Sequence, residues 1–359
     1  MSRFKNNSAM LVTTLLVRQQ TGAALLSAML TVTLVATFAS AALWQQFRSL
    51  EVETAERGRL QSALILTGAL DWARLILRED GRSAGADHLA EPWAVPLEEA
   101  RLSTFLAVDG VAPEADRDAF LSGTITDMQG RLNIANLLDG ANKSEVGLAS
   151  FKRLFELLDL PPQALATLAD NYQAAAKRAY QPPSPASGAS AAAAPAGNPT
   201  APDLSADFLS PQRFDQLAWL GLDAQTLAVL EPHISVLPAR TPVNLNTASA
   251  LVIAASTPGL DLAGAEKLVA ARARKHFTTL AEANQSLGNP GLSFIEGQHS
   301  VATRFFEVRG QLRLDQLSVF ERSLVQRDGR NVRTLWRARG ALSQASGAGE
   351  PAPNTALRP

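Results

Sequence analysis

Residues 23–43 read AALLSAMLTVTLVATFASAAL, an apolar stretch near the start of the chain that contains neither Gly nor Pro. No charged residue occurs between Arg18 and Arg48. At about 1.5 Å per helical residue, the stretch would reach roughly 31 Å, which matches the hydrocarbon thickness of a bilayer. A buried helix of a soluble protein is the alternative, but such helices seldom run this far without a charge. The stretch therefore predicts a membrane-spanning helix.

The charges that flank this stretch predict its orientation. Arg3, Lys5 and Arg18 precede it, and no acidic residue does. The positive-inside rule then leaves the N-terminus in the cytoplasm and sends everything after Leu43 across the membrane.

A helical pattern continues beyond the apolar stretch. Apolar residues recur there at spacings of three and four, which is typical of one stripe of an amphipathic helix: Ala63, Leu66, Leu70, Ala73 and Leu77. We therefore expect one helix from about Ala23 to Arg78, half in the membrane and half docked on a folded domain.

The composition excludes several classes of function. The 359 residues include no Cys, which excludes disulfides, thiol nucleophiles, iron–sulfur clusters and cysteine-bound zinc. A net charge of −1 provides no bulk field for a polyanion, so nucleic-acid binding is not expected. No Ser/His/Asp arrangement, phosphate-binding loop or catalytic carboxylate pair stands out. We predict that the chain is not an enzyme and has no catalytic, cofactor-binding or metal-binding residue.

Two kinds of processing fit the N-terminal stretch. A signal peptidase would cut after the small-residue triplet Ala39-Ser40-Ala41, and would release a secreted or periplasmic binding module. Against this, the apolar stretch is longer than the 7–15 residues usual in a signal peptide. The other possible cut lies before the stretch, between Gly22 and Ala23.

The residues around that second cut resemble the type IV pilin-like proteins, whose prepilin peptidase cleaves after a cytoplasmic glycine. The match is RQQTG at 18–22 followed by AALL at 23–26. The resemblance implies cleavage between Gly22 and Ala23, and N-methylation of Ala23.

One departure from the common pattern narrows the resemblance. Most members carry Glu at the fifth mature position, where this chain has Ser27. A carboxylate at the bilayer centre costs about 2.5–3.5 kcal/mol, so it needs a partner. In the family that partner is thought to be the terminal amine of a subunit already in the fibre. A subunit that is inserted first would gain nothing from the carboxylate, and Ser27 fits such a subunit.

Four later stretches are similar to the minor pseudopilin K family of type II secretion systems, also called general secretion pathway protein K. They are residues 79–81, 87–94, 123–137 and 241–248. The resemblance implies a single-pass inner-membrane protein that joins minor pseudopilins I and J at the tip of the periplasmic pseudopilus. There it would initiate and cap assembly for protein secretion across the outer membrane. It also implies contact with other pseudopilins, inner-membrane secretion components and prepilin peptidase.

The resemblance and the residue pattern together predict an α+β fold. A pilin-like long N-terminal helix would pack on an antiparallel sheet that carries a large inserted all-α domain of helix-hairpin-helix or SAM-like type. We expect strands at 121–127, 132–136, 304–314, 317–325 and 332–338, and helical segments at 143–180 and 211–287. The expected segments are a leader (1–22), a membrane helix (23–43), the helix continuation with the first part of the pilin-like domain (44–139), the inserted domain (140–298) with a linker (181–202), the C-terminal strands (299–340) and a flexible tail (341–359).

Two polar groups invite a chemical interpretation. Asp87, His88 and Glu91 could ligate a metal or act as an acid–base pair, but their spacing fits no zinc signature, so turn hydrogen bonding and packing is the preferred interpretation. The second group lies at a predicted strand-turn-strand, where Asp and Asn side chains bond to the local backbone. Its members are Asp127, Arg131, Asn133 and Asn136.

Residues 246–277 resemble a helix-hairpin-helix. Asn246 or Thr247 would cap its first helix. Such hairpins can bind a DNA phosphate through the N–H groups of a Gly-rich turn, and Arg272, Arg274 and Lys275 would supply charge. In this chain, however, the turn contains Asp261, which would face the phosphate, so we expect no nucleic-acid partner.

The resemblance also suggests a calcium site, because relatives bind this ion through an acidic loop in the helical domain. Calcium needs six to eight oxygen ligands, several of them carboxylates. The corresponding part of this chain has Asp170 and, beyond an uncharged linker, Asp203 and Asp207. These acids are too few in one place, and we predict no cofactor.

Overall fold

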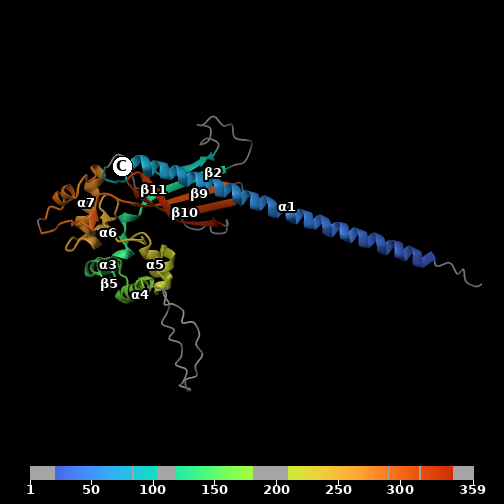
Figure 1. Ribbon diagram of the computed structural model, residues 1–359, viewed down its shortest axis with the longest axis horizontal. Helices are drawn as coiled ribbons and strands as arrows, with labels where there is room; N and C mark the ends of the chain where they lie inside the picture. Colours follow the sequence, from blue (N-terminus) through green and yellow to red (C-terminus); the bar gives the residue numbers. More distant parts are fainter. Residues whose placement is uncertain are drawn as a thin grey trace, which may run out of the picture. The chain divides into compact units, whose positions relative to one another are not determined.

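The computed structural model describes residues 21–82, 85–102, 119–180, 209–289, 291–314 and 317–342 (Figure 1). The chain divides into two compact units, with the boundary after Ala63. Residues 1–20 of the predicted leader, the whole predicted linker and residues 343–359 of the predicted tail lie outside the described residues.

One long helix, α1, runs from Thr21 to Asp80. The predicted single helix from about Ala23 to Arg78 is therefore confirmed. Its residues up to Ala63 belong to the first unit, and the remainder begins the second.

A five-stranded antiparallel sheet forms one layer of the second unit, in the order β1-β2-β9-β10-β11. The strands are β1 (Leu97–Arg101), β2 (Ala119–Asp127), β9 (Phe305–Leu314), β10 (Leu317–Asp328) and β11 (Asn331–Leu342). The predicted C-terminal meander is confirmed, and its last two strands are longer than expected. Gly329, in the turn between β10 and β11, has a φ of 58°, a conformation that glycine adopts without strain.

The part of α1 in the second unit covers one face of this sheet. Leu66, Leu70, Ala73 and Leu77 are buried, as the apolar stripe predicts. They pack in two clusters with sheet residues and with Trp93: Leu121, Phe306, Val308, Leu312, Val319, Val325 and Val332. Each fully buried leucine side chain contributes about 1.5–3 kcal/mol to folding, so the stripe fixes the helix on the sheet.

Between β2 and β9 the chain forms a separate helical block, residues 128–304, with its own core. Its helices are η3 (Met128–Gly130), η4 (Ile134–Leu137), α3 (Glu145–Leu157), α4 (Pro162–Tyr180), η5 (Phe214–Leu220), α5 (Ala224–Leu230), α6 (Ala250–Ser256), α7 (Leu262–Arg274) and α8 (Leu280–Gln285). Its short strands are β3 (Leu132–Asn133), β4 (Leu138–Asp139), β5 (Asn142–Lys143), β6 (Ile234–Ser235), β7 (Val243–Asn244) and β8 (His299–Ser300). The predicted combination of long helix, antiparallel sheet and inserted helices is confirmed.

Side-chain caps explain where several of these helices begin. Ser144 accepts a hydrogen bond from the Gly147 N–H (3.2 Å) at the start of α3, and Asp223 accepts one from the Thr226 N–H (2.9 Å) at the start of α5. Gly147 also lies against η4, where a Cβ would come within 1.9 Å of the Asn136 carbonyl oxygen. The close contact between α3 and η4 therefore requires a glycine.

Two predictions about local structure were wrong. The strand expected at 132–136 is only two residues long, because the Asn133 side chain accepts the Ala135 N–H (3.1 Å) and the chain turns into η4. No strand was expected before residue 121, but β1 lies there, preceded by the short helix η1 (Pro92–Ala94). Residues 103–118 lie outside the described residues.

Candidate functional site

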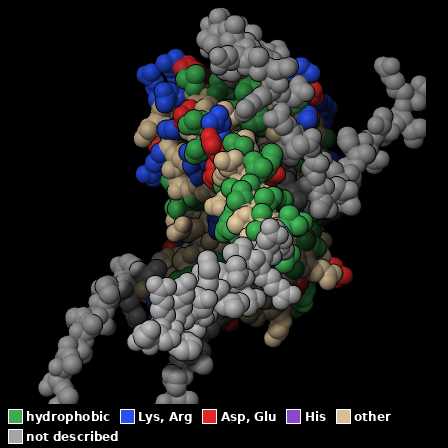
Figure 2. All heavy atoms as spheres, turned by 90° about the vertical axis from the view of Figure 1, so that its right-hand side faces the viewer, with side chains coloured by type: hydrophobic (Ala, Val, Ile, Leu, Met, Phe, Trp, Pro, Cys, Tyr) green, Lys and Arg blue, Asp and Glu red, His purple; other side chains and the backbone are tan. Residues whose placement is uncertain are grey.

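The first candidate site is the N-terminal part of α1. Figure 2 shows hydrophobic side chains gathered along the described part of this helix in the centre of the view. Large apolar side chains are exposed here: Leu25 (66%), Val32 (67%) and Phe38 (68%) are examples. The most apolar window of the helix has a mean hydropathy of 1.9, and by length and composition the helix could cross a membrane.

The polar side chains of this segment are satisfied within the helix. Ser27 Oγ donates to the Ala24 carbonyl oxygen (2.9 Å), and Thr31 and Ser40 make the same kind of bond to carbonyls of the preceding turn (2.8 Å each). An unpaired hydroxyl would cost several kcal/mol in a bilayer, and each of these three hydroxyls already has a partner in the helix. Gly22, Ala23 and Ser27 all lie in α1, and its first turn contains no acidic residue.

The second candidate site is the group Asp87, His88 and Glu91. The His88 ring stacks on the His276 ring, with ring centroids 3.7 Å apart, and is not part of the carboxylate grouping described below. Glu91 Oε2 accepts the His88 N–H (2.9 Å) and the Trp93 Nε1–H (2.7 Å). The preferred interpretation as turn bonding and packing is therefore confirmed for Glu91.

A third carboxylate, Asp80 at the end of α1, joins these two. Oxygens of Asp80, Asp87 and Glu91 lie within 4.8 Å of one another, a grouping that could hold a cation. The Arg327 guanidinium from β10, however, donates to both Asp80 and Asp87 and supplies positive charge at this point. Burial raises the pKa of the Glu91 carboxyl to about 7. The cluster ties the end of α1 to β10.

Asp127, at the end of β2, is the centre of a buried polar junction. Its Oδ1 accepts from Gln129 N–H (2.7 Å) and Thr303 Oγ1 (2.6 Å), and its Oδ2 accepts from Asn244 Nδ2 (2.9 Å) and Thr247 Oγ1 (2.6 Å). Burial raises the pKa of this carboxyl, and the four hydrogen bonds oppose that rise. The predicted bond to the local backbone is confirmed, but three of the donors come from distant segments. Asp127 therefore joins the helical block to the sheet.

The other polar residues of that motif act within the helical block. Asn136 forms a pair of hydrogen bonds with the backbone of Thr241 (2.8 and 3.1 Å), and Asn133 Nδ2 donates to the Ala239 carbonyl oxygen (2.7 Å). Arg131 Nη1 donates to the Glu231 carbonyl oxygen (2.9 Å) instead of to its own turn. Asn133 and Asn136 therefore hold the segment that leads into β7.

Residues 246–277 form the predicted helical hairpin, α6 and α7, but the predicted cap was wrong. Ser249 caps α6, with Val252 N–H 3.4 Å from its Oγ. Asn246 instead exchanges two hydrogen bonds with the backbone of Phe277 (2.9 Å each), which leaves its side chain unable to cap the helix.

The hairpin is poorly suited to bind a phosphate. Asp261 accepts the Gly264 N–H (2.9 Å) and so places a carboxylate at the N-terminus of α7. Arg272 donates to the Leu245 carbonyl oxygen, and burial lowers its pKa to about 10. Lys275 pairs with Glu282 (2.6 Å). Arg272 and Lys275 therefore already have partners within the protein, and a carboxylate stands at the turn where a phosphate would bind.

Of the three acids considered for calcium, Asp170 alone lies within the described residues. Asp170 pairs with Lys143, while Asp203 and Asp207 lie outside the described ranges.

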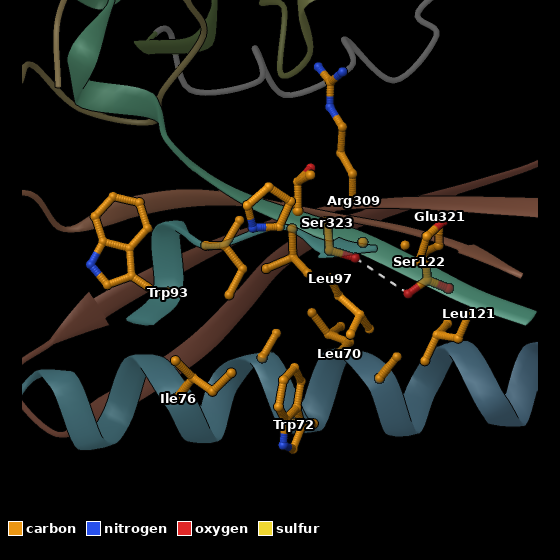
Figure 3. A pocket seen from close by; sticks show the side chains of 18 of the residues that line it. Leu70, Trp72, Ile76, Trp93, Leu97, Leu121, Ser122, Arg309, Glu321 and Ser323 are labelled. Atoms are coloured by element: carbon orange, nitrogen blue, oxygen red, sulfur yellow. Dashed lines mark hydrogen bonds between the residues drawn. The ribbon is translucent and has the colours of Figure 1, made fainter. Parts of the chain in front are cut away.

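An apolar groove of about 220 Å³ lies between α1 and the sheet (Figure 3). Leu70 and Ile76 of α1 face Leu97 and Leu121 of the sheet across it, whereas Arg309 points to the opposite side of the sheet. Its lining is mostly apolar and offers packing surface.

Sequence reasoning missed Arg327, Thr303 and Asn244. Each lies far along the chain from the residue it contacts, and no local pattern marks it. Asn244 alone lay in a stretch, 241–248, that the family resemblance had singled out.

Two family models match the helical block. Residues 130–239 and 243–302 match the first and second of two models, both described as "Type II secretion system (T2SS), protein K".

Two known proteins resemble the chain over most of its length. The "Type II secretion system protein K" of Pseudomonas aeruginosa is 27% identical over 337 residues, which cover 90% of this chain and 94% of the relative. A chain in the crystal structure of the GspK-GspI-GspJ complex from the enterotoxigenic Escherichia coli type 2 secretion system matches with a TM-score of 0.55. It is 15% identical, and the match covers 80% of this chain and 99% of that one, so it supports the fold.

Proposed function

Since the chain belongs to the protein K family of type II secretion systems, we propose that it is a minor pseudopilin at the tip of the periplasmic pseudopilus. In this role it starts and caps the assembly of the fibre that serves protein secretion across the outer membrane. The role is that of an assembly subunit, and it requires no catalytic group and no cofactor.

The observation that carries the proposal is the difference between the two parts of α1. Its first part presents exposed apolar side chains without a charge between Arg18 and Arg48. Its last part buries Leu66, Leu70 and Leu77 against the sheet. A helix with both properties suits a subunit that is anchored in a membrane while it holds a folded domain outside it.

The proposed maturation follows from the residues at the start of α1. Prepilin peptidase cleaves between Gly22 and Ala23, the new terminus at Ala23 is methylated, and the mature chain stays in the inner membrane with its N-terminus on the cytoplasmic side. At position 27 a carboxylate would help only a subunit that has a neighbour already in the fibre, and this chain has Ser27 instead. Small residues along the helix allow close packing against neighbouring helices.

The proposed partners are minor pseudopilins I and J. The solved complex that supports the fold contains proteins named GspK, GspI and GspJ. By the same analogy the helical block contains the predicted inserted domain, residues 140–298, which stands at the tip and blocks the addition of further subunits. Other pseudopilins would contact α1.

A secreted or periplasmic helix-hairpin-helix binding module is the alternative, and the mature N-terminus separates the two. Mass spectrometry of the protein purified from membranes should find a chain that begins at methylated Ala23. A chain that begins at Ala42 would contradict the proposal. Gly22→Leu should abolish processing. Gly68→Leu is the matched control, since a Cβ at Gly68 meets no atom within 4 Å.

Ser27→Glu tests the position of the subunit in the fibre. A subunit at the tip gains nothing from this carboxylate, so secretion and recovery of the I–J complex should stay at or below the wild-type level, with Ser27→Ala as the control. A clear gain in incorporation along the fibre would show that the subunit has a neighbour above it.

A further inference from the structure

The two edges of the five-stranded sheet differ in length. β1, at one edge, has five residues, and its pairing with β2 is irregular between Leu97 and Ala100. β11, at the other edge, has 12 residues and pairs with β10. Among the described residues, β11 has no strand on its outer side. A long edge strand presents a row of N–H and C=O groups that can receive another strand.

The outer side of β11 is already used near its start. Arg74 of α1 donates from Nε and from Nη2 to the Val332 carbonyl oxygen (3.2 and 2.7 Å). The backbone groups of Val332 therefore point away from β10, and α1 supplies their partner. This contact closes the first part of the edge to another strand.

Farther along β11 the outward backbone groups are open. Alternate residues of an antiparallel strand point both their N–H and their C=O to the same side. Counted from Val332 across the bulge between Thr334 and Trp336, the outward residues are Arg337 and Arg339. Within the described part of the chain, no loop or side chain bonds to these outward groups. Both residues are exposed, so a second strand can reach them.

The side chains of these two arginines lie on the face of the sheet that α1 covers. Arg337 Nε and Arg339 Nε both donate to the carboxylate of Glu321 (3.1 Å each), which also lines the groove beside α1. In the described ranges, no second carboxylate lies within 4 Å of either guanidinium. Two cations therefore share one anion, and both arginine side chains stay more than a third exposed, at 38% and 39%.

The opposite face of the same segment is small and apolar. Ala338 and Gly340 alternate with the arginines and so lie on that face. A Cβ at Gly340 would come within 2.3 Å of the Phe320 ring, so this half-buried ring from β10 covers the glycine. A strand added beside β11 would place an apolar side chain next to the ring.

A second copy of this chain is a poor occupant of the edge. Antiparallel pairing of two β11 strands around this segment would set Arg337 and Arg339 of one copy opposite the arginines of the other. Like charges directly opposite each other destabilise a sheet. β1 carries acidic residues, but it is short and its register is interrupted. The charges instead fit a foreign strand with acidic residues at alternate positions.

We propose that the edge of β11 at residues 337–340 receives an antiparallel strand of a partner polypeptide, whose two acidic side chains, two residues apart, face Arg337 and Arg339. Backbone hydrogen bonds attach the strand, and the charge pairs select it. The residue between the two acids turns to the Phe320 side. The same arginines keep basic and purely apolar strands away from the edge. The proposal does not depend on the assembly function proposed above.

The test uses the full-length protein in detergent micelles and the peptide acetyl-Thr-Glu-Val-Glu-Val-amide. Methyl groups on the two Glu nitrogens remove the N–H groups that face β11, whereas methyl groups on the two Val nitrogens remove N–H groups that face solvent. In isothermal titration calorimetry the Glu-methylated peptide should bind at least about tenfold more weakly than the unmodified one, because it loses two backbone hydrogen bonds. The Val-methylated peptide is the matched control and should stay within about threefold.

Hydrogen exchange locates the bound strand. The amide hydrogens of Arg337 and Arg339 should exchange at least about tenfold more slowly when the peptide is bound, while that of Ala338, which points to β10, should change little. In the free protein the two arginine amides should exchange fast at every protein concentration. Slow exchange at high concentration alone would assign the edge to a second copy, and slow exchange at all concentrations would assign it to another part of this chain. Either result would overturn the proposal.

Three variants test the charges. Arg339→Gln should weaken binding roughly twofold to fivefold, the size of one exposed cross-strand pair. Arg339→Glu should reverse the preference, so that the peptide with Lys in place of Glu binds better than the acidic one. Arg333→Gln is the matched control: Arg333 is exposed on the same strand before the bulge and bonds to Gln326 (2.7 Å), and its loss should leave the affinity unchanged.

Other results would contradict the proposal. Equal affinity of the two methylated peptides would show that the edge does not hold the strand, as would a dissociation constant of the unmodified peptide above about 1 mM. Wild-type preference for the acidic peptide in Arg339→Glu would remove the role of charge. If that variant does not fold, the methylated peptides and Arg339→Gln decide.

Discussion

Replacing Asp127 with Asn perturbs the junction between the sheet and the helical block at one atom. The side chain keeps its shape, but one acceptor oxygen becomes a donor NH2 group. If the remaining oxygen faces Gln129 and Thr303, the new NH2 faces the Asn244 amide, from which Asp127 accepts a hydrogen bond at 2.9 Å in the wild type. Thr247 can rotate its hydroxyl to accept, whereas Asn244 can only donate at this position.

The loss in free energy of unfolding follows from the hydrogen bonds that change. The substitution loses one hydrogen bond to a charged acceptor, about 1.5–3 kcal/mol, and leaves one buried amide hydrogen without a partner, about 1–3 kcal/mol. Relief of the buried charge offsets part of this loss. We expect the free energy of unfolding to fall by about 3 kcal/mol.

Urea unfolding of the full-length protein in detergent micelles, followed by circular dichroism, measures the change. Thr124→Ala is the control, because Thr124 is exposed on the same strand, and it should shift stability by no more than about 0.5 kcal/mol. Limited proteolysis should also release the helical block more readily from the Asn variant. A loss of less than about 1 kcal/mol in Asp127→Asn would refute the view that this carboxylate joins the two parts.

Three further predictions concern packing and pH. Leu77→Ala, in the fully buried stripe of α1, should cost about 3–5 kcal/mol in an unfolding titration, against less than about 1 kcal/mol for the half-exposed Leu75→Ala. The folded pKa of Glu91 is about 7 and its unfolded value is lower, so the folded state binds more protons between these two values, and this group makes stability fall as pH rises to about 7. Glu91→Gln, whose oxygen can accept the same two hydrogen bonds, should remove that part of the fall in thermal midpoints measured from pH 5 to 8. An unchanged profile would contradict the assignment. Gly147→Ala should destabilise the helical block strongly, since its Cβ would lie 1.9 Å from a carbonyl oxygen, whereas Gly68→Ala should be neutral or raise the thermal midpoint.

The elements in which one pattern repeats over a long stretch were predictable from sequence. The stripe from Leu66 to Leu77 and the C-terminal meander repeat one pattern over many residues, and local pattern dominates there. β1 was missed because LEEAR, at 97–101, has no alternating apolar residues; it is an edge strand that is held by its pairing with β2.

The candidate sites were predictable only in part, because their partners are distant in sequence. Asp127 was expected to bond to its own turn, and it does, but Thr247 and Thr303 reach it from segments more than a hundred residues away. Asn246 looked like a helix cap because its side chain suits that role, and the tertiary structure uses the same side chain to hold Phe277. Where a side chain could form several hydrogen bonds, the fold and not the neighbouring sequence decides which of them forms.

The pairing of Asp127 with Phe306 has an evolutionary consequence. The chain leaves the sheet and re-enters it at two residues that face each other across adjacent antiparallel strands. Everything between them is in effect a cassette: a gene that lost it would need only a tight turn to join β2 to β9 as an ordinary hairpin. Large domains could thus be gained, exchanged or enlarged at this one point during descent, while the strand order of the host remained untouched.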